Sequence, residues 1–499
     1  MLTNTSAGKK YKFPLLIGLL FLVSGLLLNT FGSQNFYSYD DDDYFAVSTS
    51  IAFGHPLNYS HEYVTGDGTP THPIGAGILA APFVFFGSVV DRLTHSPLAK
   101  NRTVNNRDFS WSLLGFEIAT QFYFLLGLLI LFHLGKNKSD PKTSFKATIL
   151  ILFSSNLFPY VFDRPIMSHT YEFFLTSLAL SILLTRKKIS RKLAIIYGAL
   201  LAMLALTRYN DLLIGIAFLM VFHLRNTCEK RRSTIYSALS FLATLLILRI
   251  LPMAYSGFKG TDLRSGTNLT DVMHIPSFSH AIGRVIHVFF GLDMGLIFTA
   301  GSTIIGFIIL IPFIFKKWNW LLGLSLLSNL YVVITWTEFG SFYGYRYLVF
   351  TLYPFAFLGI LKLFNVEMIK ARVLKYLLYL ATFVNLYSLI AWQTAPSYRL
   401  NSSDYEAPYY QKNSLSGLSH FNISPILTHV KFGIIEFWKS FQIQNIQVLN
   451  IGEIHFSAHQ ILWLQIKYLS PLITLIFFFA AWYIWDHLIA PRKNLQFLN

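Results

Sequence analysis

Apolar runs of about 20 residues recur along this chain of 499 residues, and polar segments separate them. A helix rises about 1.5 Å per residue, so about 20 apolar residues span the hydrocarbon core of a bilayer. The pattern predicts an all-α polytopic membrane protein with about 12 transmembrane helices, within a range of about 11 to 13. The expected spans are residues 13–31, 110–133, 146–162, 166–185, 193–207, 210–224, 234–252, 291–315, 318–336, 344–361, 374–392 and 468–489.

The composition excludes the ordinary soluble classes of protein. Only 13% of the residues are charged and 54% are apolar, whereas soluble domains carry about 25% charged residues. A single cysteine, Cys228, excludes disulfide frameworks and cysteine-based metal sites. The formal net charge of +16 raises the question of a nucleic-acid partner until the positions of the basic residues are considered.

The basic residues gather in short loops on one side of the expected membrane. Of the 40 Lys and Arg residues, 24 lie within residues 9–12, 136–146, 186–192, 225–232, 316–317, 362–375 and 492–493. Loops rich in Lys and Arg stay in the cytoplasm, which places both termini there. The near-absence of cysteine favours a bacterial inner (cytoplasmic) membrane as the location of this integral protein. The charge thus follows from topology and needs no nucleic acid, although it can also attract anionic membrane lipids.

Three long segments face the opposite side, namely residues 32–109, 253–290 and 393–467, and they hold most of the acids and histidines. A chain with so much polar sequence on one face is expected to work there. Within the first segment, residues 72–92 are apolar enough to span a membrane but include two prolines and three glycines. We expect these residues to break it into an interfacial or re-entrant helix that closes over an active cavity.

Four consecutive aspartates, Asp40–Asp43, follow shortly after the first expected helix. Adjacent carboxylates repel one another unless a cation or a basic partner compensates. A carboxylate held just outside a membrane can act as general base for an acceptor hydroxyl or amine. It can also ligate a hard divalent cation, with Asp41 and Asp43 as possible ligands, although no ligand set is closed. The simpler alternative is a solvated acidic loop.

The acidic tract, Tyr44, Gly54 and the run at residues 73–83 (PIGAGILAAPF) together resemble the first extracytoplasmic loop of the GT-C glycosyltransferases. More narrowly, they resemble the aminoarabinose transferase and protein O-mannosyltransferase group. The resemblance implies a catalytic pair of acids four residues before a tyrosine, which falls on Asp40 and Asp41. Because this chain has four aspartates where the family has two, Asp42 is an alternative.

Two further runs resemble the family and imply residues that bind a phosphate. Residues 207–211 (TRYND) divide a long apolar stretch at a tight outer turn, and Arg208 lies where the family commonly has a basic residue. Residues 340–347 (GSFYGYRY) resemble a late run of the family, which implies that Arg346, with Tyr345 beside it, binds the donor phosphate. Arginine suits this task because its planar fork matches a pair of phosphate oxygens. The alternative for Arg346 is a snorkelling residue in an aromatic belt at the membrane interface.

A third group of residues is expected to line the acceptor or substrate pocket. For Asp163 the alternative is a helix-end role paired with Arg164. His169 and Glu172 are three residues apart on one helical face, and a structural hydrogen-bonded pair is the alternative for them. The group consists of Tyr44, Asp67, His72, Asp163, His169 and Glu172.

The resemblance implies an inverting glycosyltransferase that moves a sugar from a polyprenyl-phosphate-linked donor to a lipid, glycan or protein acceptor on the extracytoplasmic face. It implies no certain cofactor, with a divalent cation as a possibility. Residues 1–392 would form the GT-C-like catalytic module, 393–467 an extracytoplasmic region, and 468–499 the last helix and a cytoplasmic tail.

Two alternative functions belong to other classes of membrane protein. A polysaccharide polymerase or ligase also has about twelve spans and a large outer loop, but it tends to rely on late arginines and histidines instead of an early acidic tract. A secondary transporter would place ionisable groups in mid-membrane. Here Glu117 and Arg249 are the few charges well inside the expected spans.

Overall fold

The computed structural model describes residues 39–56, 70, 72–95, 110–153, 157–162, 165–185, 190–225, 230–250, 278–290, 295–314, 320–335, 351–366, 369–394, 450–451 and 454–455. Within these ranges the chain is helical apart from one antiparallel pair of two-residue strands, β1 (Asn450–Ile451) and β2 (Ile454–His455). The all-α architecture predicted from the sequence is therefore confirmed.

The helices divide between long elements and short turns. The longest are α3 (Gly75–Leu93), α4 (Trp111–Lys136) and α19 (Ile369–Thr394). The remaining ones are α2 (Tyr39–Ala52), α5 (Pro141–Phe153), α6 (Leu157–Phe162), α7 (His169–Thr185), α8 (Arg191–Thr207), the 3₁₀ turn η1 (Tyr209–Asp211), α9 (Leu212–Arg225), α10 (Lys230–Leu245) with its π-helical end η2 (Leu246–Ile250), α13 (Phe278–Phe290), α14 (Leu296–Thr299), α15 (Gly301–Ile314), α16 (Trp320–Thr335) and α18 (Tyr353–Phe364).

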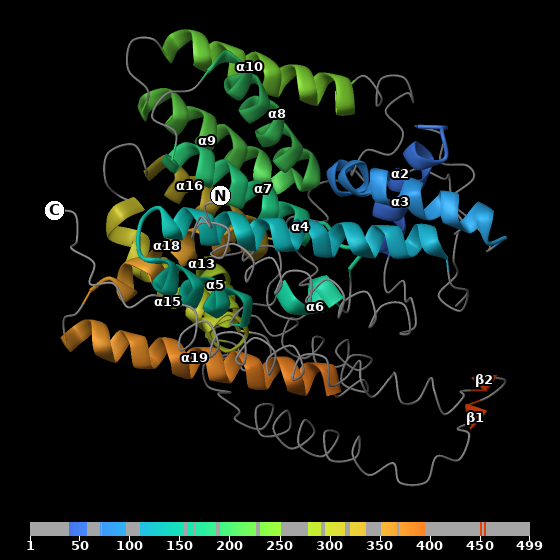
Figure 1. Cartoon of the computed structure of the whole chain (residues 1–499). Coiled ribbons are helices and arrows are strands. Elements are labelled where there is room, and N and C mark those ends of the chain that lie inside the picture. The colour runs from blue at the N-terminus through green and yellow to red at the C-terminus, as the bar shows by residue number, and fades with distance from the viewer. Residues whose placement is uncertain are drawn as a thin grey trace, which may run out of the picture.

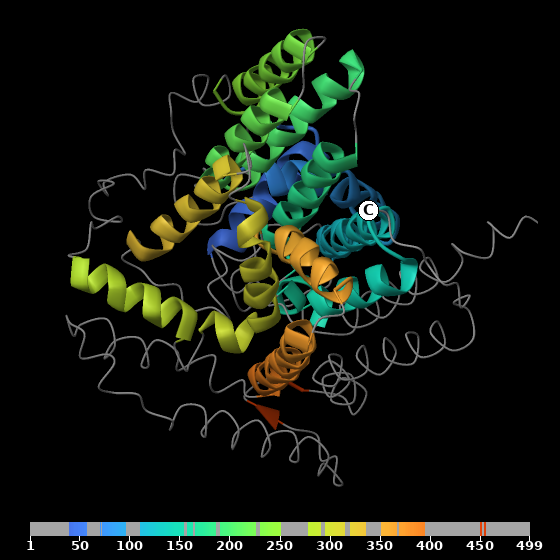
Figure 2. The same ribbon diagram turned by 90° about the vertical axis from the view of Figure 1, so that its left-hand side faces the viewer.

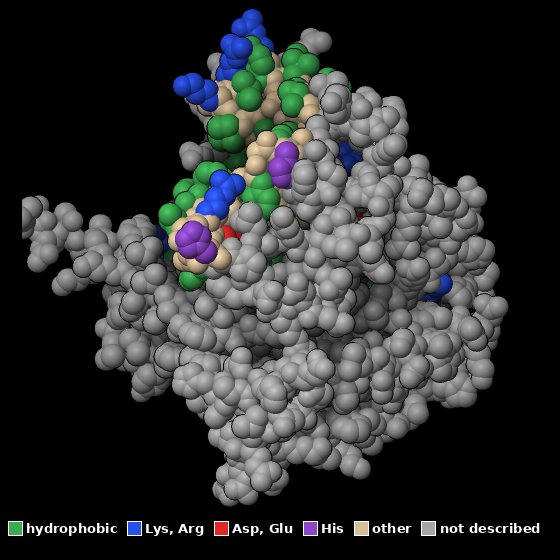
Figure 3. All heavy atoms as spheres, turned by 90° about the vertical axis from the view of Figure 1, so that its right-hand side faces the viewer, with side chains coloured by type: hydrophobic (Ala, Val, Ile, Leu, Met, Phe, Trp, Pro, Cys, Tyr) green, Lys and Arg blue, Asp and Glu red, His purple; other side chains and the backbone are tan. Residues whose placement is uncertain are grey.

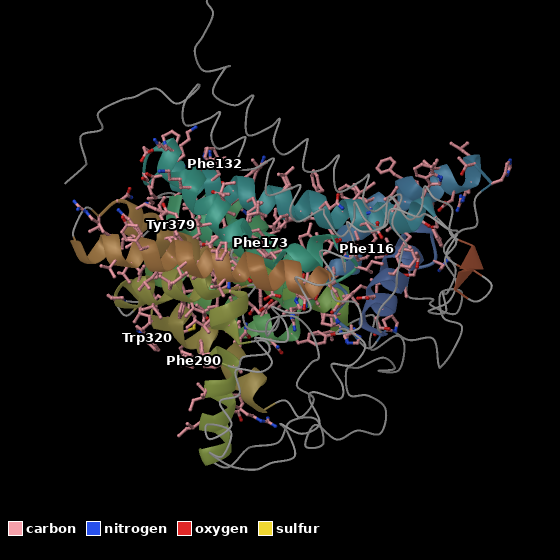
Figure 4. All side chains as sticks on the ribbon, turned by 90° about the horizontal axis from the view of Figure 1, so that it is seen from below. Phe116, Phe132, Phe173, Phe290, Trp320 and Tyr379 are labelled. Atoms are coloured by element: carbon pink, nitrogen blue, oxygen red, sulfur yellow. The ribbon has the colours of Figure 1, made fainter. Side chains whose placement is uncertain are left out.

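Helix α4 is the element around which the others are arranged. In Figure 1 it runs across the molecule, with α2 and α3 near one end and α5, α15 and α18 near the other. Figure 2, turned by 90°, agrees with Figure 1 in placing α10 on one side of the helical body and α19 on the opposite side. In Figure 4, Phe116 of α4 lies toward α2 and Phe132 toward the far end, with Phe173 of α7 between them. Helix α2, which carries the acidic tract, contacts this end of α4, where the ring of Phe45 lies 6.2 Å from the ring of Phe116.

Residues 75–93 form one continuous helix, α3, so the break expected at Gly77, Pro82 and Gly87 is wrong. Pro82 lies inside α3 on the exposed side, where the loss of one backbone hydrogen bond is tolerated. The small residues serve close packing instead, since the Cβ of any residue at Gly87 would overlap the backbone of Trp111 in α4. Asp91 fixes this junction by accepting hydrogen bonds from the backbone N–H groups of Trp111 (2.7 Å) and Ser112 (2.9 Å).

Three expected spans have different boundaries in the structure. The described parts of the span 146–162 belong to α5 and α6, and residues 154–156 lie outside the described residues. The span 291–315 is interrupted at Ala300, whose backbone is not helical. Of the span 344–361, residues 344–350 lie outside the described residues, and the rest belongs mainly to α18, which has Pro354 in its first turn, where a proline is tolerated.

Two of the basic loops, at residues 136–146 and 362–375, lie together at one end of the bundle. Helix α4 ends there at Lys136, and Ser139 in the following turn donates a hydrogen bond to Asn365 at the end of α18 (2.7 Å). Lys375 near the start of α19 donates to the carbonyl of Val366 (2.9 Å). This grouping agrees with the positive-inside assignment of these loops. Both chain termini lie outside the described residues.

Three described helical segments are long and apolar enough to cross a membrane, by length and composition: Gly75–Leu93, Trp111–Lys136 and Arg232–Ile250. Several shorter helices are also apolar, such as Gly301–Pro312 and Tyr353–Phe364. The count of about twelve spans stays a prediction, because the expected spans 13–31 and 468–489 lie outside the described residues. The division of the chain into residues 1–392, 393–467 and 468–499 also stays a prediction.

Replacing Gly359 with Ala is expected to destabilise the bundle. Gly359 of α18 lies directly against Gly306 of α15, so that a Cβ there would overlap the Gly306 backbone. Forcing the helices apart costs about 1–3 kcal/mol, which would lower both the apparent melting temperature and the yield of monodisperse protein in detergent. Gly283→Ala in α13 is the control, because its Cβ would enter open space. Equal stability of G359A and the wild type would contradict the close packing.

Candidate active site

The aspartate tract lies in helix α2, and two of its side chains face the protein interior. Asp41 and Asp43 are only 1% and 6% exposed, so the alternative of a solvated acidic loop is wrong. Burying a carboxylate is costly unless a partner compensates. A helix that nevertheless buries two of them marks a candidate functional site. The side chains of Asp40 and Asp42 lie outside the described part of the chain.

His72 is the partner of Asp43. Its backbone N–H and its ring Nδ1 both donate hydrogen bonds to Oδ2 of Asp43, at 3.0 and 2.6 Å. The ring of Tyr44 packs edge-on against the imidazole of His72, with 5.8 Å between the ring centroids. Two residues of the expected pocket, Tyr44 and His72, therefore lie together with Asp43, although His72 is far from both in the sequence.

The first turn of α3 joins α2 to the end of α8 through two glycines. A Cβ at Gly77 would lie 2.7 Å from the carbonyl oxygen of Tyr44, and a Cβ at Gly75 would lie 2.6 Å from the backbone nitrogen of Thr207. Only glycine allows so close an approach on both sides. Thr207 is followed directly by Arg208, so the acidic helix and this arginine belong to one packed unit.

Arg208 lies at the centre of a second buried polar cluster. Its Nη1 donates a hydrogen bond to Nδ1 of His169 at 2.6 Å and lies 3.7 Å from Oε2 of Glu172. Since a guanidinium has no acceptor atom, Nδ1 of His169 must carry no proton, and the ring is neutral with its proton on Nε2. Tyr160 of α6 packs edge-on against His169, with ring centroids 4.9 Å apart.

Two fully buried carboxyl groups share the guanidinium of Arg208. Glu172 is 0% and Asp211 is 1% exposed, and both lie close enough to interact electrostatically with Arg208. The side chain of Asn329 in α16 approaches Asp211, and the backbone of Thr351 approaches Glu172. The cluster around Arg208 thus extends from α7 and the turn after α8 to α16 and the residues before α18. This geometry fixes the orientation of the Arg208 fork.

The structure places seven residues predicted from the sequence in two groups. Asp41, Asp43, Tyr44 and His72 lie on the α2 side, and His169 and Glu172 of α7 lie with Arg208 at the turn after α8. His169 and Glu172 are a contacting pair, 3.6 Å apart, and both face Arg208. The remaining predicted residues lie outside the described residues: Asp67, Asp163, Arg164, Tyr345 and Arg346.

Two residues of the Arg208 cluster were not singled out from the sequence. Asp211 belongs to the 207–211 run. Because the chain has only 24 acids, an acid at an outer turn could have been predicted as a functional residue from the sequence. Asn329 is an amide in the middle of a mostly apolar expected span, the kind of intramembrane polar residue that usually has a partner or a function.

The metal hypothesis stays a prediction. In the ranges that the structure describes, no three His, Cys, Asp or Glu side chains are placed so that they could hold a metal ion. Asp43, one of the two expected ligands, already accepts two hydrogen bonds from His72.

The face of the molecule at the α2 and α3 end is shown in Figure 3. Among its described residues, hydrophobic side chains predominate, with a few basic and histidine side chains between them. The exposed apolar residues on α3 include Phe85, Phe86 and Leu93. Such a surface suits contact with lipid better than contact with water.

No protein-family profile matches the chain, and no curated protein matches it significantly. Among solved structures it is similar to ArnT from Cupriavidus metallidurans in the apo state, with 11% identity, 96% of this chain and 78% of that chain covered, and a TM-score of 0.49. It is also similar to ArnT from Cupriavidus metallidurans bound to undecaprenyl phosphate, with 12% identity, 90% of this chain and 84% of that chain covered, and a TM-score of 0.46.

The oligosaccharyltransferase of Archaeoglobus fulgidus, in a complex with zinc and sulfate, is a further similar structure. It shares 13% identity, with 79% of this chain and 57% of that chain covered and a TM-score of 0.37. At this identity and overlap the likeness extends to no individual residue.

Proposed function

We propose that this protein is an inverting glycosyltransferase of the GT-C type, which moves a sugar from a polyprenyl-phosphate-linked donor to an acceptor on the extracytoplasmic face of the membrane. One observation carries the proposal. The buried aspartates of α2 and the buried Arg208 belong to one packed unit, joined through Gly77 and Gly75 in the first turn of α3. A base for the acceptor and a cation for the leaving phosphate are the two groups that such a transfer needs.

The reaction is a single displacement at the anomeric carbon. The carboxylate of Asp41 takes the proton of the acceptor hydroxyl while the acceptor oxygen bonds to that carbon. On the opposite face of the sugar, the bond from the carbon to the carrier phosphate breaks, and its electron pair stays on the phosphate oxygen. Arg208 stabilises this developing charge, which is most effective where water is excluded. Asp40 and Asp42 on the same helix are the alternatives to Asp41 as base.

The remaining residues are assigned by position in the sequence and in the fold. Tyr44 and His72 beside the acidic helix form part of the acceptor side. Arg346 and Tyr345 complete the phosphate site together with Arg208. His169 and Glu172 hold Arg208, which differs from their first assignment to the acceptor pocket. The acceptor is a lipid, glycan or protein, and the membrane is a bacterial inner membrane with its basic loops in the cytoplasm.

The proposal is tested with the full-length protein in proteoliposomes that contain polyprenyl-phosphate-linked radiolabelled sugars. We test a panel of hexoses and aminopentoses with a membrane lipid extract as acceptor. Release of the free carrier phosphate and a transferred sugar of inverted anomeric configuration are expected. Retention of configuration, or equal use of a nucleotide-linked sugar, would contradict the proposal. If every carrier stays intact while the solute crosses the bilayer, the protein is a secondary transporter instead.

A further inference from the structure

Arg249 is a charged residue near the outer end of the expected span 234–252, and the proposed reaction leaves it without a role. It belongs to η2, the π-helical end of α10. Short π-helical turns are rare and occur frequently at functional sites. A charge within a membrane span is costly, so it usually has a partner or marks the path of a substrate. Both features make Arg249 a candidate functional residue.

The surface around Arg249 is apolar and faces outward. Figures 1 and 2 both place α10 at the edge of the helical body, beside α8. Only 11% of the apolar window in Arg232–Ile250 is buried, compared with 50% for the window in α4. Leu246, Ile247 and Ile250 of η2 are all exposed, and Arg249 itself is half-buried. Because such a surface suits lipid better than water, Arg249 lies at the boundary between protein and membrane.

On its inner side, Arg249 adjoins the candidate active site. Its guanidinium carbon Cζ lies 5.2 Å from the centroid of the Tyr209 ring, and Tyr209 directly follows Arg208 in the chain. Leu248, the residue before Arg249, packs against a buried cluster that includes Val47 of α2. From the lipid side, η2 therefore contacts both elements of the proposed reaction, namely the acidic helix and the turn that carries the phosphate-binding arginine.

The opposite end of the same two helices has a matching arginine–tyrosine pair. Arg191 at the start of α8 lies over the ring of Tyr236 in α10, with 4.5 Å from its Cζ to the ring centroid. Both helices start at this end, since Ser237 of α10 donates a hydrogen bond to the carbonyl of Ala194 in α8 (2.9 Å). The basic loops before α8 and α10 assign this end to the cytoplasm. Arg249 therefore belongs to the extracytoplasmic end, where the donor is used.

We infer that Arg249 binds the phosphate of the polyprenyl carrier at the protein–lipid boundary, an inference that rests on the proposed function. A guanidinium over an aromatic ring is held by its flat face, while the N–H groups at its edge can donate to a pair of phosphate oxygens. The exposed apolar side chains of η2 suit the polyprenyl chain better than a water-soluble phosphate. Arg249 thus selects lipid-linked donors before they reach the buried Arg208, and it takes no part in bond breaking.

The binding test compares Arg249→Met with Arg191→Met, which disrupts the same kind of pair at the cytoplasmic end. Each full-length variant is purified in detergent, and its affinity for a radiolabelled polyprenyl phosphate is measured with phosphatidylglycerol or inorganic phosphate as competitor. R249M is expected to bind the carrier at least about tenfold more weakly than the wild type, because a hydrogen bond to a charged group is lost. R191M should bind like the wild type, and neither competitor should displace the carrier at equal concentration.

The kinetic test uses the sugar-linked carrier in proteoliposomes. R249M should raise KM for the donor at least about tenfold and leave kcat near the wild-type value, because the contact is made equally in the ground state and the transition state. Arg249→Lys keeps the charge but loses the planar fork, so its KM should lie between those of R249M and the wild type. R249K also carries the test if R249M does not fold.

Three outcomes would overturn the inference. If R249K and R249M keep the wild-type affinity and KM, Arg249 only anchors the end of α10 at the membrane interface. If R191M weakens carrier binding as much as R249M does, the effect is one of general charge. If phosphatidylglycerol displaces the carrier equally well, the site takes ordinary membrane lipid. Failure of the proposed function looks different, since carrier binding would then depend on Arg249 although the wild type transfers no sugar.

Discussion

Replacing Asp41 with Asn is expected to lower the rate of sugar transfer by about 10²–10⁴-fold, the usual contribution of a general base. Asparagine has nearly the same shape but cannot accept a proton at neutral pH. Asp41 shares a face of α2 with Tyr44 and Ser48, which are also buried, so its carboxylate points into the protein. The rate is measured in proteoliposomes at equal protein content, and the melting temperature verifies that D41N remains folded.

Asp40→Asn and Asp42→Asn are the matched controls, since they remove the same charge from the same helix. Both are expected to keep most of the activity if Asp41 is the base. If D40N is inactive and D41N is active, the general base is Asp40 instead of Asp41. If all three variants transfer sugar at the wild-type rate, the acidic tract is not catalytic and the proposed mechanism fails.

The helices were largely predictable from the sequence because burial in lipid demands apolar runs of a fixed length. The span 110–133 corresponds to α4 and the span 193–207 to α8, within a few residues at each end. The exception was α3, where Pro82 and the glycines suggested a broken helix. In water those residues would weaken a helix, but inside a packed bundle small residues let neighbouring backbones approach, as at Gly75 and Gly77.

The residues of the candidate site could be nominated from the sequence, but not their pairing. His169 and Glu172 share a helical face by their spacing alone. Nothing local could indicate that Arg208, 39 residues later, bonds to His169, because that contact depends on how α7 packs against α8. The contact of Asp43 with His72 is equally non-local.

Replacing Arg208 with Met is expected to prevent stable folding. The change removes the guanidinium that lies 3.7 Å from Oε2 of Glu172 and interacts electrostatically with Asp211, and both carboxyl groups are fully buried. Removing one partner of a buried ion pair costs about 3–5 kcal/mol, since the remaining charge stays buried without compensation. The yield of monodisperse protein and the melting temperature in detergent should both fall sharply. Such a result alone would not separate a structural role of Arg208 from a role in catalysis.

The triple variant R208M/E172Q/D211N makes that separation. Neutralising both acids removes the uncompensated charge, and buried ion pairs replaced by neutral groups of similar volume often leave a protein as stable as before. We therefore expect the triple variant to recover the melting temperature. If Arg208 stabilises the leaving phosphate, transfer should remain at least about 10²-fold below the wild type, the cost of losing one preorganised electrostatic group. A triple variant that is both folded and active would instead show that Arg208 only holds α7 to the turn after α8.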